Sequence, residues 1–441
     1  MSSGSIIGIA LIAAIAGMIA LNRFLKLHAF FSLLLAALFF GVATGQSFTS
    51  TLQQMQSGFG ILLQQIGFLV ALGACLGTAL EKTGAMEVVS RQVIHTVGQH
   101  RTLVAMTLVG VVVGIPVFCD SGFMILSRLV PSVAAQAAAA PAPLSLALAG
   151  GLYGSHTLIP PTPGPLAAAA NLGLAEQLPL VMGLGLIVSV PLAVVSTWAA
   201  KKLGSIKTTS ANHPAPTQAS MHPWRAFLPL VVPIILISTS TVFQVLPVPP
   251  FIRAWLSAIG HPAIALAIGC LLSVALSKVP SPEWPTWMAE ALREAGVILL
   301  ITGAGGAFGA VIKSSGIASV LEESLSGSAV QGIWFLCIAF LVAAVLKTAQ
   351  GSTTSAMIVT SSLLAPMAAL AGIGTPAQLT TLLLAIGGGA MTVSHANDSY
   401  FWVVSQFGHI APRDAWRSFT VLTLLQGLTV LSSSILLFLL L

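Results

Sequence analysis

Gly154-Ser-His-Thr-Leu-Ile-Pro-Pro-Thr-Pro-Gly-Pro165 is the stretch of sequence around which the rest of the chain is organised. Its four prolines and two glycines cannot continue a helix, because proline lacks a backbone N–H and clashes with the preceding turn. Apolar residues flank the stretch on both sides, which places the break at membrane depth. Irregular backbone survives there only where it is buried in protein or lines a cavity. The stretch therefore predicts a broken membrane helix beside a transporter binding site.

The composition predicts an all-α polytopic membrane protein. Of the 441 residues, 56% are hydrophobic and 6% are charged, whereas soluble domains carry about 25% charged residues. The excess of 17 Lys+Arg over 11 Asp+Glu comes without a basic patch containing aromatics, so it indicates membrane topology rather than nucleic-acid binding. The four cysteines have no metal-binding spacing, and neither a disulfide framework nor a metal site is expected.

Spans of roughly 20 apolar residues recur along the chain. Because the N-terminus lacks the positive region of a signal peptide, Ile6–Leu21 is expected to be a retained span. The predicted spans are 5–22, 28–46, 59–80, 178–200, 226–246, 262–278, 295–313 and 418–441.

The chain is predicted to consist of two halves with one plan: spans, a re-entrant helical hairpin and a broken helix. In chain order the parts are residues 1–200 with hairpin 103–136 and broken helix 144–173, the polar linker 201–225, and residues 226–441 with hairpin 329–371 and broken helix 376–408.

Three local matches support an internal repeat. Gly73-Ala-Cys-Leu-Gly77 aligns with Gly305-Gly-Ala-Phe-Gly309, the same offset places Asp120 opposite Ser352, and Ser155-His156 then matches Ser394-His395. If the hairpins do not cross the bilayer, the first half crosses it an odd number of times, and the second half runs upside down.

The basic residues predict the orientation. With the N-terminus outside, only Arg253 and Lys313 fall on the outside, and the linker is cytoplasmic. The basic residues that fall inside are Arg23, Lys26, Lys82, Arg91, Arg101, Lys201, Lys202, Lys207, Arg225, Lys278, Arg293, Arg413 and Arg417.

Two aspartates, Asp120 and Asp398, lie in the predicted membrane core, at the first hairpin turn and the second helix break. A carboxyl group inside the bilayer is costly, and is by default a functional hypothesis. Either one could take up and release a transported proton. The alternative is that each caps a helix or pairs with a basic neighbour, and Lys347 is a candidate partner for either aspartate or for an anionic substrate.

Polar groups at the turns and breaks are the candidate substrate ligands. Half-helix N-termini suit a carboxylate, and hydroxyl groups suit a polyhydroxylated solute. Histidine can bind such a solute or relay protons, although it can also brace a break, and Ser or Thr can bond back to its own helix. The candidates are Ser121, Gly122, Ser155, His156, Thr157, Thr162, Gly164, Gln350, Ser352, Thr353, Thr354, Ser394, His395 and Asn397.

Four motifs resemble the gluconate permease family of proton symporters, within the ion transporter superfamily. They are Asp120-Ser-Gly-Phe123, the proline-rich break, Ala349-Gln-Gly-Ser-Thr353, and Ser394-His-Ala-Asn-Asp398 followed by Phe401-Trp402. The resemblance implies uptake of gluconate or a related small hydroxy acid across the bacterial inner membrane. It also implies elevator-type motion and a homodimer. Proton coupling needs no cofactor.

Other functions are weighed against this one. The chain has no phosphate loop for ATP-driven transport and no nucleophile elbow for serine hydrolysis, so an enzyme is not expected. Sodium coupling, with breakpoint carbonyls and Asn397 as ligands, remains an alternative on the same fold. A channel is a further alternative, which the paired breaks disfavour because they indicate alternating access.

Overall fold

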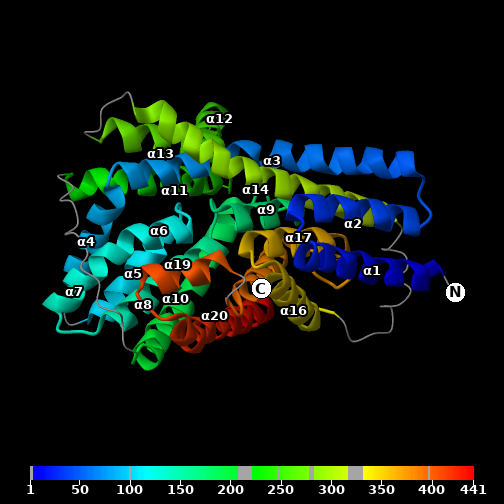
Figure 1. Ribbon diagram of the computed structural model, residues 1–441. Coiled ribbons are helices and arrows are strands. Elements are labelled where there is room, and N and C mark those ends of the chain that lie inside the picture. Colours follow the sequence, from blue (N-terminus) through cyan, green and yellow to red (C-terminus); the bar gives the residue numbers. More distant parts are fainter. Residues whose placement is uncertain are drawn as a thin grey trace.

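The computed structural model describes residues 3–98, 101–206, 221–245, 249–277, 283–315, 331–395 and 398–441, whose regular elements are helices (Figure 1). Most of the predicted linker 201–225 and the candidate ligand Asn397 lie outside the described residues.

Three helices open the chain and contact one another in sequence. They are α1 (Ser3–Phe24), α2 (Ala29–Ala43) and α3 (Phe48–Lys82). The Ser47 hydroxyl accepts a hydrogen bond from the Ser50 N–H at 3.2 Å, which satisfies one of the free donors at the start of α3. From there α3 continues for 35 residues. It begins well before the predicted span 59–80, because its glutamine-rich first turns are polar yet form helix readily.

The first hairpin region consists of several short helices. The charged stretch after α3 forms a helix that was not predicted, α4. The following elements are α4 (Ala85–Val97), α5 (Thr102–Gly114), α6 (Cys119–Leu126), the 3₁₀ turn η2 (Ser127–Leu129) and α7 (Val130–Gln136). The break between α5 and α6 contains Pro116, and it places Asp120 in the first turn of α6.

The proline-rich stretch interrupts the next helix. The elements here are α8 (Pro141–Leu158), α9 (Pro163–Asn171) and α10 (Leu178–Leu203). Thr162 closes the break, because its hydroxyl oxygen lies 2.7 Å from the carbonyl oxygens of both His156 and Ile159. Freed carbonyls therefore find a partner inside the protein, as lipid requires.

The second half opens with α11 (Pro223–Val245), α12 (Pro250–Ile259), α13 (Pro262–Ala275) and α14 (Trp284–Ser314). Helix α12 is short and was not predicted. Helix α14 begins before the predicted span 295–313, because its polar first turns, which contain Glu290 and Glu294, remain helical.

The last five helices contain two breaks. They are α16 (Ile333–Gln350), α17 (Thr353–Ala368), α18 (Pro376–Met391), α19 (Ser399–Phe407) and α20 (Pro412–Leu440). Gly351 ends α16 at a φ of 73°, a left-handed conformation that glycine adopts without steric cost. Ser352 then caps α17 by accepting the Ser355 N–H at 3.2 Å.

The helices form two layers (Figure 1). The long helices α3 and α14 lie side by side in one layer with α11 and α13, and the broken helices occupy the other. Small residues allow the closest contacts. At Gly58 and Gly306 the backbones of α3 and α14 meet, and at Gly151 the backbone of α8 meets Thr107 and Gly110 of α5. At Gly389 α18 approaches α16 in the same way.

Among the described residues, three helices are long and apolar enough to cross a bilayer by themselves: α10, α14 and α20. Helix α3 is a fourth if its two parts, Phe48–Gln65 and Gly67–Lys82, count as one span despite a bend of 47°. The shorter apolar helices include α5, α16, α17 and α18. They lie against one another or against α8, so that protein covers the broken regions.

We expect Gly151→Ala to destabilise the protein by about 1–3 kcal/mol, because a methyl group there would overlap the Thr107 carbonyl oxygen in the α5–α8 contact. Gly183→Ala is the matched control, since Gly183 is an exposed glycine of α10 with open space around it. Thermal unfolding in detergent should show a lower Tm for the first variant only. Equal Tm values would contradict the α5–α8 packing.

Candidate functional site

Four helices start at a break, where the backbone N–H groups of the first turn lack a partner inside the helix. They are α6, α9, α17 and α19. Helix starts of this kind attract negative charge through their free donors and the helix dipole. The four associate in two pairs, α9 with α17 and α6 with α19. Each pair joins a helix of one half of the chain to a helix of the other.

In the first pair, α9 and α17 run side by side from a common starting point. A Cβ at Gly164, near the start of α9, would lie 3.0 Å from the Met357 sulfur and 3.7 Å from the Thr354 hydroxyl. At the other end, the Asn171 amide donates to the Ile358 carbonyl at 3.2 Å and to the Ser361 hydroxyl at 2.8 Å. Asn171 is seven positions after Gly164, and Ser361 is seven positions after Thr354. The two helices therefore run parallel to each other.

In the second pair, the starts of α6 and α19 carry the two aspartates. The Ser399 hydroxyl of α19 donates to Oδ2 of Asp120 at 3.5 Å. The other carboxylate oxygen of Asp120, Oδ1, is buried and has no hydrogen-bond partner among the described residues. Behind it, the rings of Phe123 and Tyr400 pack edge to face at 6.2 Å.

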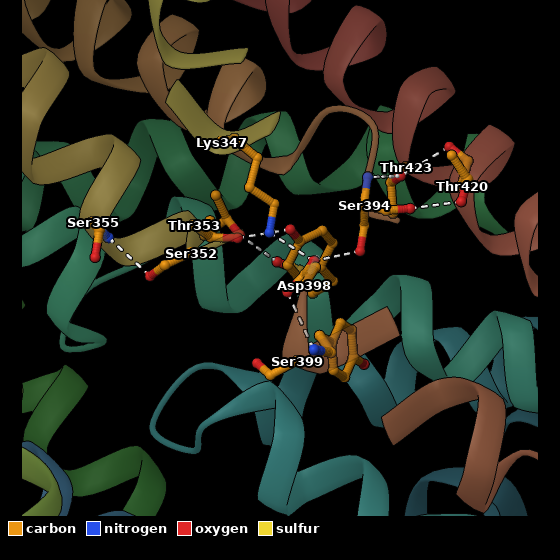
Figure 2. Close-up of polar contacts among 12 residues, drawn as sticks. Lys347, Ser352, Thr353, Ser355, Ser394, Asp398, Ser399, Thr420 and Thr423 are labelled. Carbon is orange, nitrogen blue, oxygen red and sulfur yellow. Dashed lines mark hydrogen bonds and ion pairs between the residues drawn. The ribbon is translucent and has the colours of Figure 1, made fainter. Parts of the chain in front are cut away.

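Asp398 is the most heavily bonded polar residue of the site (Figure 2). Its Oδ2 forms an ion pair with Nζ of Lys347 at 2.6 Å, with side chains only 4% and 1% exposed. The Ser394 hydroxyl donates to the same oxygen. The other oxygen, Oδ1, accepts the Tyr400 N–H at 3.2 Å and caps α19. In this structure Asp398 is therefore both a helix cap and the partner of a basic residue.

Lys347 reaches the aspartate from the last turn of α16. Its ammonium group also lies 5.8 Å from the centre of the Tyr153 ring, within range of a cation–π attraction. The Tyr153 hydroxyl in turn is 2.7 Å from the Thr353 hydroxyl at the start of α17. Lys347 therefore stands between the two pairs of helix starts.

The segment before Asp398 is anchored to α20 (Figure 2). The Ser394 N–H donates to the Thr423 hydroxyl at 3.0 Å, and the Thr420 hydroxyl donates to the Ser394 carbonyl at 2.6 Å. A helix break normally leaves such groups without a partner. Here α20 supplies the partners, which fixes the position of the Ser394 hydroxyl against Asp398.

Sequence reasoning missed the two tyrosines. The chain contains only two, Tyr153 and Tyr400, and their rings lie 5.1 Å apart in the site. The Tyr400 hydroxyl donates to the Ala149 carbonyl at 3.0 Å. The signal was present, because each tyrosine is next to a predicted break. Thr420 and Thr423 were also missed, since they lie within the apolar pattern of a span.

The candidate ligands at the first break mostly bond within their own segment. The Ser155 hydroxyl donates to the Gly151 carbonyl at 3.2 Å, and the Thr157 hydroxyl donates to the Tyr153 carbonyl at 2.7 Å. Like that of Thr162, these hydroxyls brace the break in this structure. Their predicted contribution to substrate binding stays a prediction.

The two candidate histidines face different neighbours. The ring of His156 lies 5.9 Å from Phe118 and hydrogen-bonds to the Val117 backbone, while its buried Nδ1 has no hydrogen-bond partner in the described part of the chain. The ring of His395 lies 5.5 Å from Trp416 of α20. The structure therefore does not bring the two imidazoles together.

The remaining candidates lie at the start of α6 and at the end of α16. Ser121 and Gly122 lie in α6, with Gly122 against Leu152. Gln350 is the last residue of α16 by its backbone, and its side chain is outside the described part of the structure.

Two cavities lie along the first pair of helices: one is at the C-terminal ends of α9 and α17, and the other is beside the proline break. A cavity of about 490 Å³ lies between α9, α17, α3 and α14, and polar residues on its wall include Gln65, Asn171, Lys313 and Ser362. A second, apolar cavity of about 270 Å³ lies beside the proline break, against Pro160 and Pro161. The first cavity is polar enough to admit a hydroxylated solute to the surface between the two helix layers.

Comparisons with known proteins identify the family. The family model of the GntP family permeases matches residues 6–440. The chain belongs to the GntP permease family. It is a multi-pass membrane transporter and not an enzyme.

Individual proteins agree with this assignment. The chain is 32% identical to the inner membrane permease YgbN of Escherichia coli, over 92% of each chain. It is 30% identical to a gluconate permease of Pseudomonas aeruginosa, over 93% of each chain. The crystal structure of the YdaH transporter of Alcanivorax borkumensis has the same fold, with a TM-score of 0.68 and 16% identity over 93% of this chain and 97% of that one.

The contact between Tyr153 and Thr353 can be measured by a double-mutant cycle with Tyr153→Phe and Thr353→Val. We expect a coupling energy of about 1 kcal/mol in thermal or chemical unfolding, because each variant removes one side of the same buried hydrogen bond. Ser90→Ala with Thr353→Val is the control cycle, and it should be additive because Ser90 lies in α4 and its hydroxyl bonds to the Met86 carbonyl of the same helix. Additivity in both cycles would show that the tyrosine–threonine contact is not formed.

Proposed function

We propose that this permease takes up gluconate or a related sugar acid together with a proton across the bacterial inner membrane. The observation that carries the proposal is the unequal charge of the two pairs of helix starts. The start of α9 and α17 has no acidic side chain, whereas the start of α6 and α19 carries Asp120 and Asp398. One pair suits an anion and the other suits a cation.

The substrate carboxylate would bind where α9 and α17 begin. Two helix dipoles point there, and the first turns carry the N–H groups of Gly164, Thr353 and Thr354, since Pro163 and Pro165 have none. Thr353 and Thr354 offer hydroxyl groups to the polyol chain of a sugar acid. The name of the gluconate permease from Pseudomonas aeruginosa supports this class of substrate.

The proton would bind at the carboxylates of the second pair. A buried carboxyl group is a common proton carrier in membrane transporters, and this pair holds two of them: Asp398, and Asp120, whose Oδ1 has no hydrogen-bond partner among the described residues. The same oxygen also favours a second candidate, sodium coupling, because hard cations prefer carboxylate and carbonyl oxygens.

The arrangement of the helices supports transport by two inverted repeats. Each half of the chain supplies one member to each pair of helix starts, as a two-fold relation between the halves requires. The layer containing α3 and α14 would serve as the fixed scaffold, and the layer of broken helices as the moving part of an elevator-type transporter. The homodimer and a periplasmic N-terminus stay predictions.

Uptake of labelled gluconate into proteoliposomes tests the function. We expect accumulation when the interior is more alkaline than the exterior, and we expect it to collapse when a protonophore removes the gradient. Replacing sodium by choline should leave the rate unchanged. Dependence on sodium would favour the second candidate, and uptake indifferent to both gradients would exclude symport.

Gly164→Ala should raise the KM for gluconate about tenfold with the fold intact, because a methyl group there would displace the Met357 sulfur, 3.0 Å away, at the common start of α9 and α17, and would cost roughly one charge-assisted hydrogen bond to the carboxylate. Gly183→Ala, in the exposed face of α10, is again the matched control. Initial rates of uptake over a range of gluconate concentrations give the KM of each variant. An unchanged KM in Gly164→Ala would place the carboxylate elsewhere.

A further inference from the structure

The buried ion pair between Lys347 and Asp398 belongs to a cluster in which negative charges outnumber positive ones. Its two side chains are almost fully enclosed and lie 2.6 Å apart, so each charge depends on the other for stabilisation. Asp120 adds a second carboxylate nearby, bonded to Ser399, the residue after Asp398. Among the described residues that form this cluster, Lys347 is the only cation. A bound sugar acid would bring in a third carboxylate.

Lys347 is placed to reach that third carboxylate. It sits in the last turn of α16, and Gly351 and Ser352 alone separate α16 from α17. Its ammonium group lies near the Tyr153 ring, whose hydroxyl contacts Thr353 in the first turn of α17. A lysine side chain carries its compact charge on a flexible stem of four carbons. It can therefore turn from Asp398 towards the start of α17 along the face of Tyr153.

We propose that Lys347 alternates between two anions, the Asp398 carboxylate and the carboxylate of the substrate. A proton from the medium binds to Oδ2 of Asp398, and the ion pair at that oxygen breaks. The freed ammonium group then pairs with the substrate carboxylate at the starts of α9 and α17. One proton and one monovalent anion enter together, so the net charge of the site does not change. This inference rests on the proposed function and names the residue that couples its two substrates.

The surroundings of Asp398 fit this exchange. The Ser394 hydroxyl and the Tyr400 N–H contact its two oxygens and remain after Lys347 leaves. Other titratable groups that interact with it are Asp120 and Cys119 on α6, Tyr153 on α8 and Tyr400 on α19. Asp120 is the only further carboxylate among them.

Substrate binding by variants of the two residues tests the exchange. The variants are Lys347→Gln, Asp398→Asn and the double variant, with Lys201→Gln as a control because Lys201 is an exposed residue at the end of α10. The readout is the rise in Tm that gluconate causes in purified protein at pH 6 and pH 8, converted to an apparent affinity. Size-exclusion chromatography checks that each variant is folded.

Each variant has its own expected result. The wild-type protein and Lys201→Gln should bind gluconate more weakly at pH 8, by up to about tenfold per pH unit, because binding requires one proton. Asp398→Asn should bind at both pH values with the same affinity, since its amide imitates the protonated acid. Lys347→Gln and the double variant should bind at least about tenfold more weakly than Asp398→Asn.

A purely structural ion pair gives the opposite pattern. Both single variants would then lose binding, because each leaves an unpaired buried charge, and the double variant would recover it. That result overturns the exchange, as does gluconate binding by folded Lys347→Gln with wild-type affinity. A folded wild-type protein that binds no sugar acid refutes the proposed function itself, which separates the two failures.

Calorimetry of the wild-type protein keeps the test decisive if a variant does not fold. Titration with gluconate at pH 8 in buffers of different ionisation enthalpy gives the number of protons taken up per substrate. The exchange predicts an uptake close to one proton, because an ionised Asp398 must be neutralised before Lys347 is free. Binding without proton uptake overturns the proposal.

Discussion

The structure depends on the requirement that every backbone group freed by a helix break must find a partner inside the protein, because lipid offers none. Side chains meet this requirement at both broken helices. Thr162 closes the first break onto the carbonyls of its own segment, and α20 closes the second through Thr420 and Thr423. At the helix starts, Ser352 caps α17 and Asp398 caps α19, and the N–H groups that remain can bind a solute.

The two pairs of helix starts differ in charge. Because α9 pairs with α17 and α6 with α19, each half of the chain contributes a helix start to both places. Acidic side chains occur at only one of them: Asp120 and Asp398 lie at the starts of α6 and α19, and neither α9 nor α17 begins with an acidic residue. A single buried lysine lies between the two places, and its position allows each to influence the other.

Two of the breaks could be predicted from sequence because proline and glycine act locally: the interruption after Leu158 and the turn before Thr353. The interruption after Met391 contains neither residue, and the polar run Ser394-His-Ala-Asn-Asp-Ser399 within an apolar segment predicts it. The ion pair between Lys347 and Asp398 was one of three pairings left open, because sequence spacing does not determine which of two distant aspartates a lysine meets. Hydroxyl partners were the least predictable. Ser155 and Thr157 bond to their own helix, while Thr423, inside an apolar span, bonds across to Ser394.

The scarcity of phenol side chains has a practical consequence. Both tyrosines of the protein, Tyr153 and Tyr400, lie in the core of the site, one beside the buried lysine and one behind the aspartate that it pairs with. Biosynthetic labelling with fluorotyrosine would therefore place a fluorine nucleus at these two positions and nowhere else. The resulting ¹⁹F spectrum would contain two lines, and each would report on the chemistry of the transport site without background from the rest of the chain.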